Sequence, residues 1–299
     1  MSCEVTFSPN DFKSDLKPVW CPGCGDFAVL NSAYRALADL QCMPQNTVIV
    51  SGIGCSSRLP GYVETHGFNS LHGRALPIAT GVKLAAPKMT VVAVGGDGDG
   101  IAIGGNHFMH AARRNVDIAY FMMDNEIYGL TKGQAGPTTP SGDKTKSTTY
   151  GNPDAAVDPC GLAISLGASW VARAFSGDVK GTTELMTKAI RHHGFAFLNI
   201  ISPCVTWRGE HQSKELRAKM RVLPAEHEVT NREAALRFTD EKDSLTVGVL
   251  YDITRPTLLD HMKDIERSAR GDRNPPTLDE ILATFRPAAS CPSTDRLRA

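Results

Sequence analysis

Short apolar runs alternate with longer amphipathic segments along the first two thirds of the chain. Continuous apolar runs of this kind are typical of parallel strands that are buried on both faces of a sheet. The runs are Thr47–Gly52, Val91–Val94, Asp117–Met123 and Phe195–Ile201. Between them, Phe27–Leu40 and Ile103–Arg113 have apolar residues at helical spacing, and Asp26 is placed to cap the first of these helices. The pattern predicts an α/β fold with a doubly wound, mainly parallel sheet.

A glycine-rich turn, GGDGDG, follows the run at Val91–Val94, and Asp124-Asn125 closes the next run. A strand, turn, helix and strand in this order bring the carboxyl ends of both strands to one sheet edge, where open α/β proteins bind ligands. Asp97 and Asn125 should therefore lie side by side. Carboxylate and amide oxygens suit Mg²⁺, which completes its shell with phosphate oxygens, and glycines beside a helix start admit a diphosphate. We expect a metal-bridged diphosphate; the alternative is a plain turn between two core strands.

Composition narrows the class of protein. The 299 residues include 32 basic and 32 acidic side chains, so the net charge is zero. This balance argues against nucleic acid or an anionic membrane as the main partner. No apolar run approaches the roughly 18 residues of a membrane span, and the first residues lack the apolar core of a signal peptide. We therefore expect a cytoplasmic protein, in which the eight cysteines are ligands or free thiols rather than disulfides.

Four cysteines share a placement. Cys21 and Cys24 form a CPGC turn, while Cys55 and Cys204 follow predicted strands at the edge that carries Asp97. Such a set can hold an iron–sulfur cluster or zinc, and a redox dithiol at Cys21 and Cys24 is a third possibility. One CxxC pair joined by two distant cysteines favours a cluster, because structural zinc sites usually use two close pairs. The remaining cysteines have no such placement, and they are Cys3, Cys42, Cys160, which we expect to be a buried structural thiol, and Cys291.

Motifs between Lys17 and Arg208 resemble, in order, the beta subunit of 2-oxoacid:ferredoxin oxidoreductases, most closely the 2-oxoglutarate type. They are WCPGCGDF, GIGCSSRLPGY, LHGRALPIATG, GGDGDGIAIGGNHFMHAARRN, DNEIYGLTKGQ and SPCVTW. GDG followed by a pair ending in Asn also resembles the thiamine diphosphate motif, although Asp124 stands where Asn is common in the wider family. The resemblance implies the diphosphate-domain fold of thiamine enzymes.

The resemblance also implies which residues hold the cofactors. A [4Fe-4S] cluster would be held by Cys21, Cys24, Cys55 and Cys204. The Mg²⁺ ligands would be Asp97, Asn125 and the backbone oxygen of Ile127. Residues that contact or line the thiamine diphosphate would be Ile53, Gly54, Cys55, Ser56, His72, Gly73, Gly96, Gly98, Asp99, Gly129 and Leu130.

Two further residues are candidates for a role in the reaction. Lys132, in GLTKGQ, could offset a carboxylate of 2-oxoglutarate in a partly desolvated site, whereas a solvated lysine is the alternative. Pyruvate-type relatives resemble GMTGGQ at this stretch. His72 lies in a loop motif of the proposed site, and a surface or capping histidine is its alternative.

The implied reaction is the oxidative decarboxylation of 2-oxoglutarate with coenzyme A to succinyl-CoA, CO₂ and reduced ferredoxin, or its reverse. An alpha subunit would supply the pyrimidine-binding domain, so this chain alone should be inactive. The alternatives are pyruvate or a broad range of 2-oxoacids as substrate, or a non-catalytic subunit that binds a cluster or zinc. An ordinary non-oxidative thiamine decarboxylase would leave the four cysteines unexplained.

Two segments are harder to interpret. The polar stretch Lys132–Pro153 is too long for a plain connector, so it is a lid, a segment packed on another subunit, or a solvated loop. After residue 208 the chain is charged, with only short apolar patches. We therefore expect residues 1–208 to form the cofactor-binding domain, and 209–299 to be an extension that packs on that domain or on a partner.

Overall fold

The computed structural model describes residues 6–241, 244–271 and 273–286. Two of the cysteines discussed above, Cys3 and Cys291, lie outside these ranges. The chain divides into two compact units, Met1–Leu259 and Asp260–Ala299. Each unit is described by itself.

The first unit is built on a sheet of eight strands in the order β2-β1-β3-β4-β8-β7-β10-β9. The six strands from β2 to β7 are parallel to one another, β10 is antiparallel to β7, and β9 is parallel to β10. The strands are β1 (Thr47–Ser51), β2 (His66–Asn69), β3 (Thr90–Gly96), β4 (Ile118–Asp124), β7 (Trp170–Phe175), β8 (Phe195–Ile201), β9 (Met220–Val222) and β10 (Leu245–Asp252). A separate two-stranded sheet pairs β5 (Ile127–Tyr128) with β6 (Gln134–Ala135).

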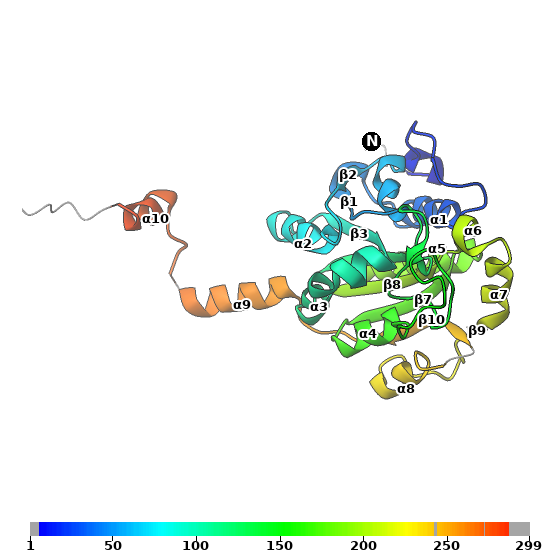
Figure 1. Ribbon diagram of the computed structural model, residues 1–299. Helices are drawn as coiled ribbons and strands as arrows, with labels where there is room; N and C mark the ends of the chain where they lie inside the picture. The colour runs from blue at the N-terminus through cyan, green and yellow to red at the C-terminus, as the bar shows by residue number, and fades with distance from the viewer. Residues whose placement is uncertain (1–5, 242–243, 272, 287–299) are drawn as a thin grey trace, which may run out of the picture. The chain divides into compact units, whose positions relative to one another are not determined.

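Helices cover both faces of the sheet, which gives a three-layer arrangement (Figure 1). One buried cluster joins α1 and α5 to one face, and a second joins α2, α3 and α4 to the other. The helices are α1 (Asp26–Asp39), α2 (Ala75–Ala85), α3 (Gly105–Arg113), α4 (Pro159–Ser165), α5 (Val179–Arg191), α6 (Val205–Arg208), α7 (Gln212–Lys219) and α8 (Arg232–Arg237). Four short 3-10 or π segments are η1 (Pro9–Phe12), η2 (Pro44–Asn46), η3 (Ser56–Tyr62) and η4 (Gly98–Ile103). The predicted α/β class with a mainly parallel sheet is confirmed.

The predicted strand, turn, helix and strand are present as β3, η4, α3 and β4. The glycine-rich turn is a π-helical segment that runs directly into α3. The prediction for Asp26 is wrong, because Gly25 occupies the N-cap of α1 and makes no side-chain cap bond. Asp26 is instead buried in the first turn, where its carboxylate accepts a hydrogen bond from the Ser202 hydroxyl at 2.7 Å. It therefore ties the CPGC turn to the end of β8.

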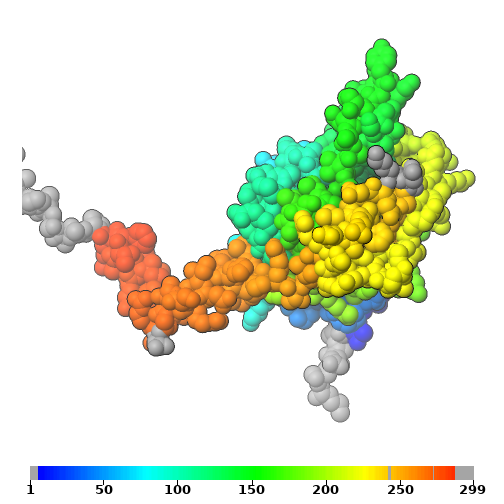
Figure 2. All heavy atoms as spheres, turned by 90° about the horizontal axis from the view of Figure 1, so that it is seen from below, coloured from blue at the N-terminus to red at the C-terminus, as the bar shows by residue number. Residues whose placement is uncertain are grey.

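The polar stretch 132–153 is anchored at its base rather than fully solvated. Thr138, Thr139 and Asn152 are buried, and β6 pairs with β5. Figure 2 shows the green segment that contains this stretch standing out from the surface of the first unit, and Tyr150 is 99% exposed. The loop thus joins a fixed base beside β4 to an exposed tip.

Residues after 208 contribute to the main sheet. The apolar patch VGVLYDI lies largely in β10, where Leu250 is fully buried and pairing with β7 continues the sheet. The patch LDEILATF forms α10 (Leu278–Thr284), which buries none of its side chains, and α9 (Leu258–Arg270) likewise buries none. Among the described residues, no helix combines the length and apolar character needed to cross a membrane.

Candidate functional site

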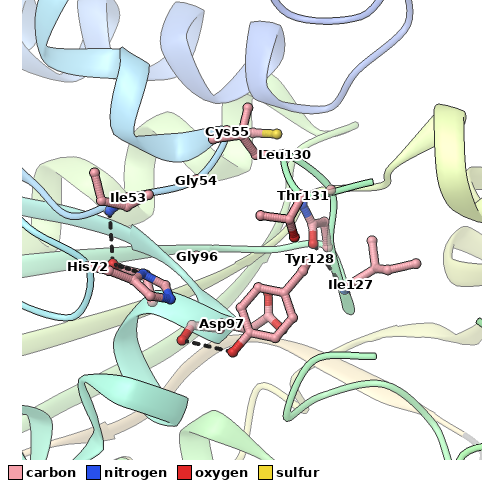
Figure 3. A pocket seen from close by; sticks show the side chains of 14 residues that line it. Ile53, Gly54, Cys55, His72, Gly96, Asp97, Ile127, Tyr128, Leu130 and Thr131 are labelled. Atoms are coloured by element: carbon pink, nitrogen blue, oxygen red, sulfur yellow. Dashed lines mark hydrogen bonds and ion pairs between the residues drawn. The ribbon is translucent and has the colours of Figure 1, made fainter. Parts of the chain in front are cut away.

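A cavity of about 170 Å³ lies beyond the carboxyl ends of β1, β3 and β4. The carboxyl ends of parallel strands are where doubly wound sheets bind ligands. Most of the predicted cofactor and metal residues line it, namely Ile53, Gly54, Cys55, His72, Gly96, Asp97, Gly98, Asp99, Asn125, Ile127, Gly129 and Leu130. Tyr128 and Thr131 also line it and escaped prediction. The rings of His72 and Tyr128, both labelled in Figure 3, meet edge to face, with centroids 6.3 Å apart.

Apart from Cys21, Cys24 and Cys204, three predicted residues lie off this wall. Ser56 is buried, and its hydroxyl has no hydrogen-bond partner. Gly73 is fixed by its backbone N–H, which donates to Asp99 Oδ1 at 2.7 Å. Lys132 is exposed and lines a neighbouring cavity. None of these three residues forms part of the surface of the first cavity.

Two buried carboxylates meet at the ends of β3 and β4. The Thr138 hydroxyl lies 3.0 Å from Asp97 Oδ2 and 2.8 Å from Asp124 Oδ1. Burial, followed by the charge of Asp124, raises the pKa of Asp97 well above its ordinary value. One hydroxyl proton can serve only one of the two oxygens, and buried carboxylates are costly unless they are paired or bind a metal. The pair is therefore suited to a divalent cation beside Asp97.

The turn after β4 presents the second predicted metal ligand. Asn125 Oδ1 accepts a hydrogen bond from the Ile127 N–H at 3.1 Å, which orients the amide. An amide oxygen has a second lone pair, so this bond leaves it able to bind a cation. Glu126, between them, has a left-handed φ of 59°, which is unusual for a residue with a side chain. The surrounding contacts must hold this turn in place.

Asp99 holds two loops against the cavity. Its Oδ1 accepts hydrogen bonds from the Ile53 N–H at 2.8 Å and the Gly73 N–H at 2.7 Å, and it lies 2.9 Å from His72 Nδ1. With Nδ1 held in this way, the orientation of the His72 ring on the cavity wall is set. The Asp99 carboxylate is therefore occupied by protein groups, and any contact with a diphosphate would fall to its backbone.

Two glycines keep the cavity open. Gly54 has a φ of +127°, and a side chain at this position would project into empty space. A Cβ on Gly98 would collide with the ring of Tyr128. A larger residue at either position would narrow the cavity or displace its wall, so the cradle fits a ligand that approaches the backbone closely.

A second cavity of about 310 Å³ lies next to the first and is lined by all four predicted cluster cysteines. Burial raises the pKa of Cys55 to about 12 and also raises the pKa of Cys204. The six described cysteines are free, and Cys160 is fully buried as expected. In the part of the chain that the structure describes, no three His, Cys, Asp or Glu side chains are arranged to hold a single metal ion. All four predicted cluster cysteines line this one cavity.

The two cavities share a wall made of Cys55, Asn125, Gly129 and Leu130. The aromatic ring of Trp207 lines the cysteine cavity, and its indole N–H donates to the Gly129 carbonyl at 2.9 Å. Trp207 lies in the SPCVTW motif, but nothing in its spacing indicates this contact. A redox group in one cavity would lie beside a ligand in the other.

Two sequence families match the chain. Residues 52–200 match the C-terminal TPP binding domain of thiamine pyrophosphate enzymes, and residues 204–267 match the C-terminal region of the pyruvate ferredoxin oxidoreductase beta subunit. The first match begins directly after β1 and runs through most of β8, so it includes every residue that lines the first cavity. The second begins at Cys204.

Individual relatives are consistent with these two family matches. The beta subunit of 2-oxoacid:ferredoxin oxidoreductase 2 from Aeropyrum pernix is 40% identical over 81% of this chain and 82% of its own length. The 2-oxoglutarate synthase subunit KorB of Methanocaldococcus jannaschii is 37% identical over 83% of this chain and 92% of its own length. A solved 2-oxoglutarate:ferredoxin oxidoreductase from Magnetococcus marinus, with 2-oxoglutarate, coenzyme A and succinyl-CoA bound, superposes with a TM-score of 0.89 at 39% identity, covering 94% of this chain and 97% of that one. The chain belongs to the family of 2-oxoacid:ferredoxin oxidoreductase beta subunits.

Proposed function

We propose that this chain is the beta subunit of a 2-oxoglutarate:ferredoxin oxidoreductase. The main support for the proposal is the wall that the two cavities share. On one side of it lies the cavity with the glycine-rich turn suited to a diphosphate, and on the other lies the cavity lined by the four cysteines. A 2-oxoacid oxidoreductase requires this juxtaposition, because electrons released at the thiamine must reach an acceptor nearby. The reaction would convert 2-oxoglutarate, coenzyme A and oxidised ferredoxin to succinyl-CoA, CO₂ and reduced ferredoxin, with both electrons passing to ferredoxin, or run in reverse.

Asp97, Asn125 and the Ile127 carbonyl would hold Mg²⁺, with the backbone at Gly98 and Gly129 against the diphosphate. The buried Asp97 and Asp124 carboxylates and the open space at Gly54 support this assignment. Bound thiamine diphosphate supplies the electron sink that allows a 2-oxoacid to lose CO₂. The protein's part is to exclude water, orient the cofactor and hold the metal.

Cys21, Cys24, Cys55 and Cys204 would hold a [4Fe-4S] cluster that passes electrons to ferredoxin. Cys55 lines both cavities, so the path from the thiamine to the cluster would be short. Burial raises the pKa of the Cys55 and Cys204 thiols, so these two are protonated when free and would have to lose their protons on ligation. Binding of the cluster would therefore release protons.

Lys132 would bind a carboxylate of the substrate. It has a left-handed φ of 80°, a conformation in which glycine carries no steric penalty. A lysine at such a position carries a steric penalty that glycine would avoid, which supports a role for its side chain. An ammonium here favours the dicarboxylate 2-oxoglutarate over pyruvate. His72 would act from the wall of the first cavity, where its ring meets the Tyr128 ring edge to face.

An alpha subunit would complete the active site by covering the first cavity. Large apolar side chains at the cavity or next to its wall are exposed to solvent in this chain: Ile53 by 41%, Leu71 by 75% and Leu130 by 52%. Exposed apolar groups around a cavity are typical of a surface that a partner buries. We place the assembly in the cytoplasm, which the free state of the described cysteines supports.

The test is co-expression with the alpha subunit, anaerobic purification and assay of ferredoxin reduction. We expect coenzyme A-dependent reduction with 2-oxoglutarate at a kcat/KM at least tenfold above that with pyruvate. Equal or better activity with pyruvate would overturn the substrate assignment. Bound cluster without thiamine diphosphate or turnover would show instead a non-catalytic subunit.

A further inference from the structure

A chain of two hydrogen bonds joins the predicted cluster turn to the predicted metal turn. The Cys204 N–H donates to Gln212 Oε1 at 3.0 Å, and the Gln212 amide donates to Glu126 Oε2 at 3.1 Å. Glu126 lies directly between Asn125 and Ile127 in the sequence. Gln212 is only 3% exposed; its bond from the Cys204 N–H is buried and its bond to Glu126 is partly buried. One buried side chain therefore connects the backbone of a cluster ligand to the turn that carries two predicted Mg²⁺ ligands.

Arg208 strengthens the same connection. Its guanidinium lies 2.9 Å from Glu126 Oε2 and 2.5 Å from Asp143 Oδ2, and its side chain is 15% exposed. It thus ties the helix after Cys204 both to the metal turn and to the polar loop. The left-handed conformation of Glu126 is costly by itself, so its carboxylate bonds help to hold the turn in place.

Trp207 adds a contact from the same short helix. Its indole N–H donates to the Gly129 carbonyl, and the Lys146 ammonium lies 4.4 Å from the ring centroid. Three side chains that follow Cys204 therefore form hydrogen bonds to the segment from Glu126 to Gly129. They are Trp207, Arg208 and Gln212. None of them lines the first cavity.

We propose that Gln212 and Arg208 are positioning residues that couple the two cofactor sites. A group bound to Cys204 would fix the backbone of that turn, and through Gln212 and Arg208 it would fix the turn at Glu126. Loading of the cysteine cavity should then tighten the binding of thiamine diphosphate and Mg²⁺, and the reverse must hold to the same degree. The inference rests on the proposed function, since it requires both cofactors.

The direct test measures thiamine diphosphate affinity in the heteromer with the cluster in place, after its removal by anaerobic chelation, and after reconstitution. Isothermal titration at saturating Mg²⁺ gives the dissociation constant, and hydrogen exchange of residues 125–133 gives the order of the turn. We expect removal of the cluster to weaken binding about tenfold, to speed exchange in this segment, and to be reversed by reconstitution. Equal affinity with and without the cluster would overturn the coupling.

Variants distinguish coupling through Gln212 from a general loss of structure. Gln212→Glu places a second carboxylate against Glu126 and should reduce the coupling to under twofold, while Glu126→Gln combined with Gln212→Glu restores a donor and acceptor pair and should recover it. Arg217→Lys, on the same helix, contacts Phe175 and the Gly177 carbonyl and should leave the coupling unchanged.

The outcomes separate the inference from the proposed function. Coupling that persists in Gln212→Glu, or that is lost equally in Arg217→Lys, would contradict the role of Gln212. Two cofactors that bind independently would refute the coupling and leave the oxidoreductase intact. A heteromer that binds no thiamine diphosphate in either state would refute both.

Discussion

Thr138 reaches Asp97 across 41 positions of sequence, and its hydroxyl lies 3.0 Å from Asp97 Oδ2. The same hydroxyl contacts the Asp124 carboxylate at the end of the neighbouring strand. The anchored base of the polar loop thus supplies a link between the ends of β3 and β4. This link sets the orientation of the carboxylate that we assign to Mg²⁺.

Thr138→Val should weaken the binding of Mg²⁺ and thiamine diphosphate to the heteromer by about tenfold to a hundredfold, because residues that orient a metal ligand contribute on this scale. Valine keeps the shape and removes the hydroxyl. Titration with Mg²⁺ at fixed thiamine diphosphate measures the effect. Thr230→Val is the control, since Thr230 bonds the exposed Glu228 far from the site along the chain. An unchanged Mg²⁺ affinity in Thr138→Val would refute this role.

Asp99→Ala should lower the free energy of unfolding by about 1–3 kcal/mol, because it leaves the buried N–H of Gly73 and the partly buried N–H of Ile53 without an acceptor. It should also raise the KM for thiamine diphosphate by freeing the His72 ring. Asp99→Asn retains an oxygen acceptor, so both the decrease in the free energy of unfolding and the increase in KM should be much smaller. Similar losses in the two variants would show that the charge, rather than the hydrogen bonds, matters.

Lys132→Gly tests the basis of substrate choice. Glycine suits the left-handed backbone at this position, so the fold should be unaffected. Loss of a charged contact predicts an increase in KM for 2-oxoglutarate of about tenfold to a hundredfold, with little change for pyruvate. Lys144→Ala, an exposed lysine of the same loop, is the control. A parallel loss with both substrates would remove Lys132 from substrate recognition.

His192 predicts a pH dependence of stability. Burial lowers the pKa of its imidazole despite the nearby Asp252 and Asp117, and Nε2 lies 2.7 Å from the Ser169 hydroxyl. Because the folded pKa lies below the unfolded value of about 6.5, the unfolded state binds the proton more readily. Stability should therefore fall as the pH decreases below about 6.5.

Thermal unfolding at pH 5.5 and 7.5 checks this. His192→Gln should reduce the difference between the two midpoints, whereas His261→Gln, at an exposed position of α9, should preserve it. A midpoint difference that is the same in His192→Gln and in the wild type would show that other groups cause the acid sensitivity.

The central strands and the edge that carries the site could be predicted from the sequence, because buried parallel strands are continuous apolar runs. β3 and β4 therefore stand out, and the residues that follow them, Asp97 and Asn125, necessarily meet at one edge. Cys55 and Cys204 follow β1 and β8 in the same way. Their convergence on one cavity depends only on strand order and direction.

Contacts that depend on loop conformation could not be predicted. Thr138 and Gln212 reach the site from segments without periodicity, so no spacing rule indicates their partners. Asp26 looked like a helix cap because caps are recognised by residue type, whereas its burial against Ser202 depends on how the CPGC turn packs on β8. The sequence also gives little basis for predicting β10 as a strand of the main sheet, because its apolar residues form a single short run in a charged region.

The most direct test of the account is EPR spectroscopy with iron, sulfide and zinc analysis of the anaerobically purified, dithionite-reduced heteromer. We expect a reduced [4Fe-4S] signal that is lost in Cys204→Ala and Cys21→Ala. The signal should be retained in Cys160→Ala, because that thiol is buried between α4 and β7 and contacts the Ala172 carbonyl. Oxidation of the reduced signal by ferredoxin would place the cluster on the electron path. Zinc without iron, or an iron signal that survives in Cys204→Ala, would contradict the account.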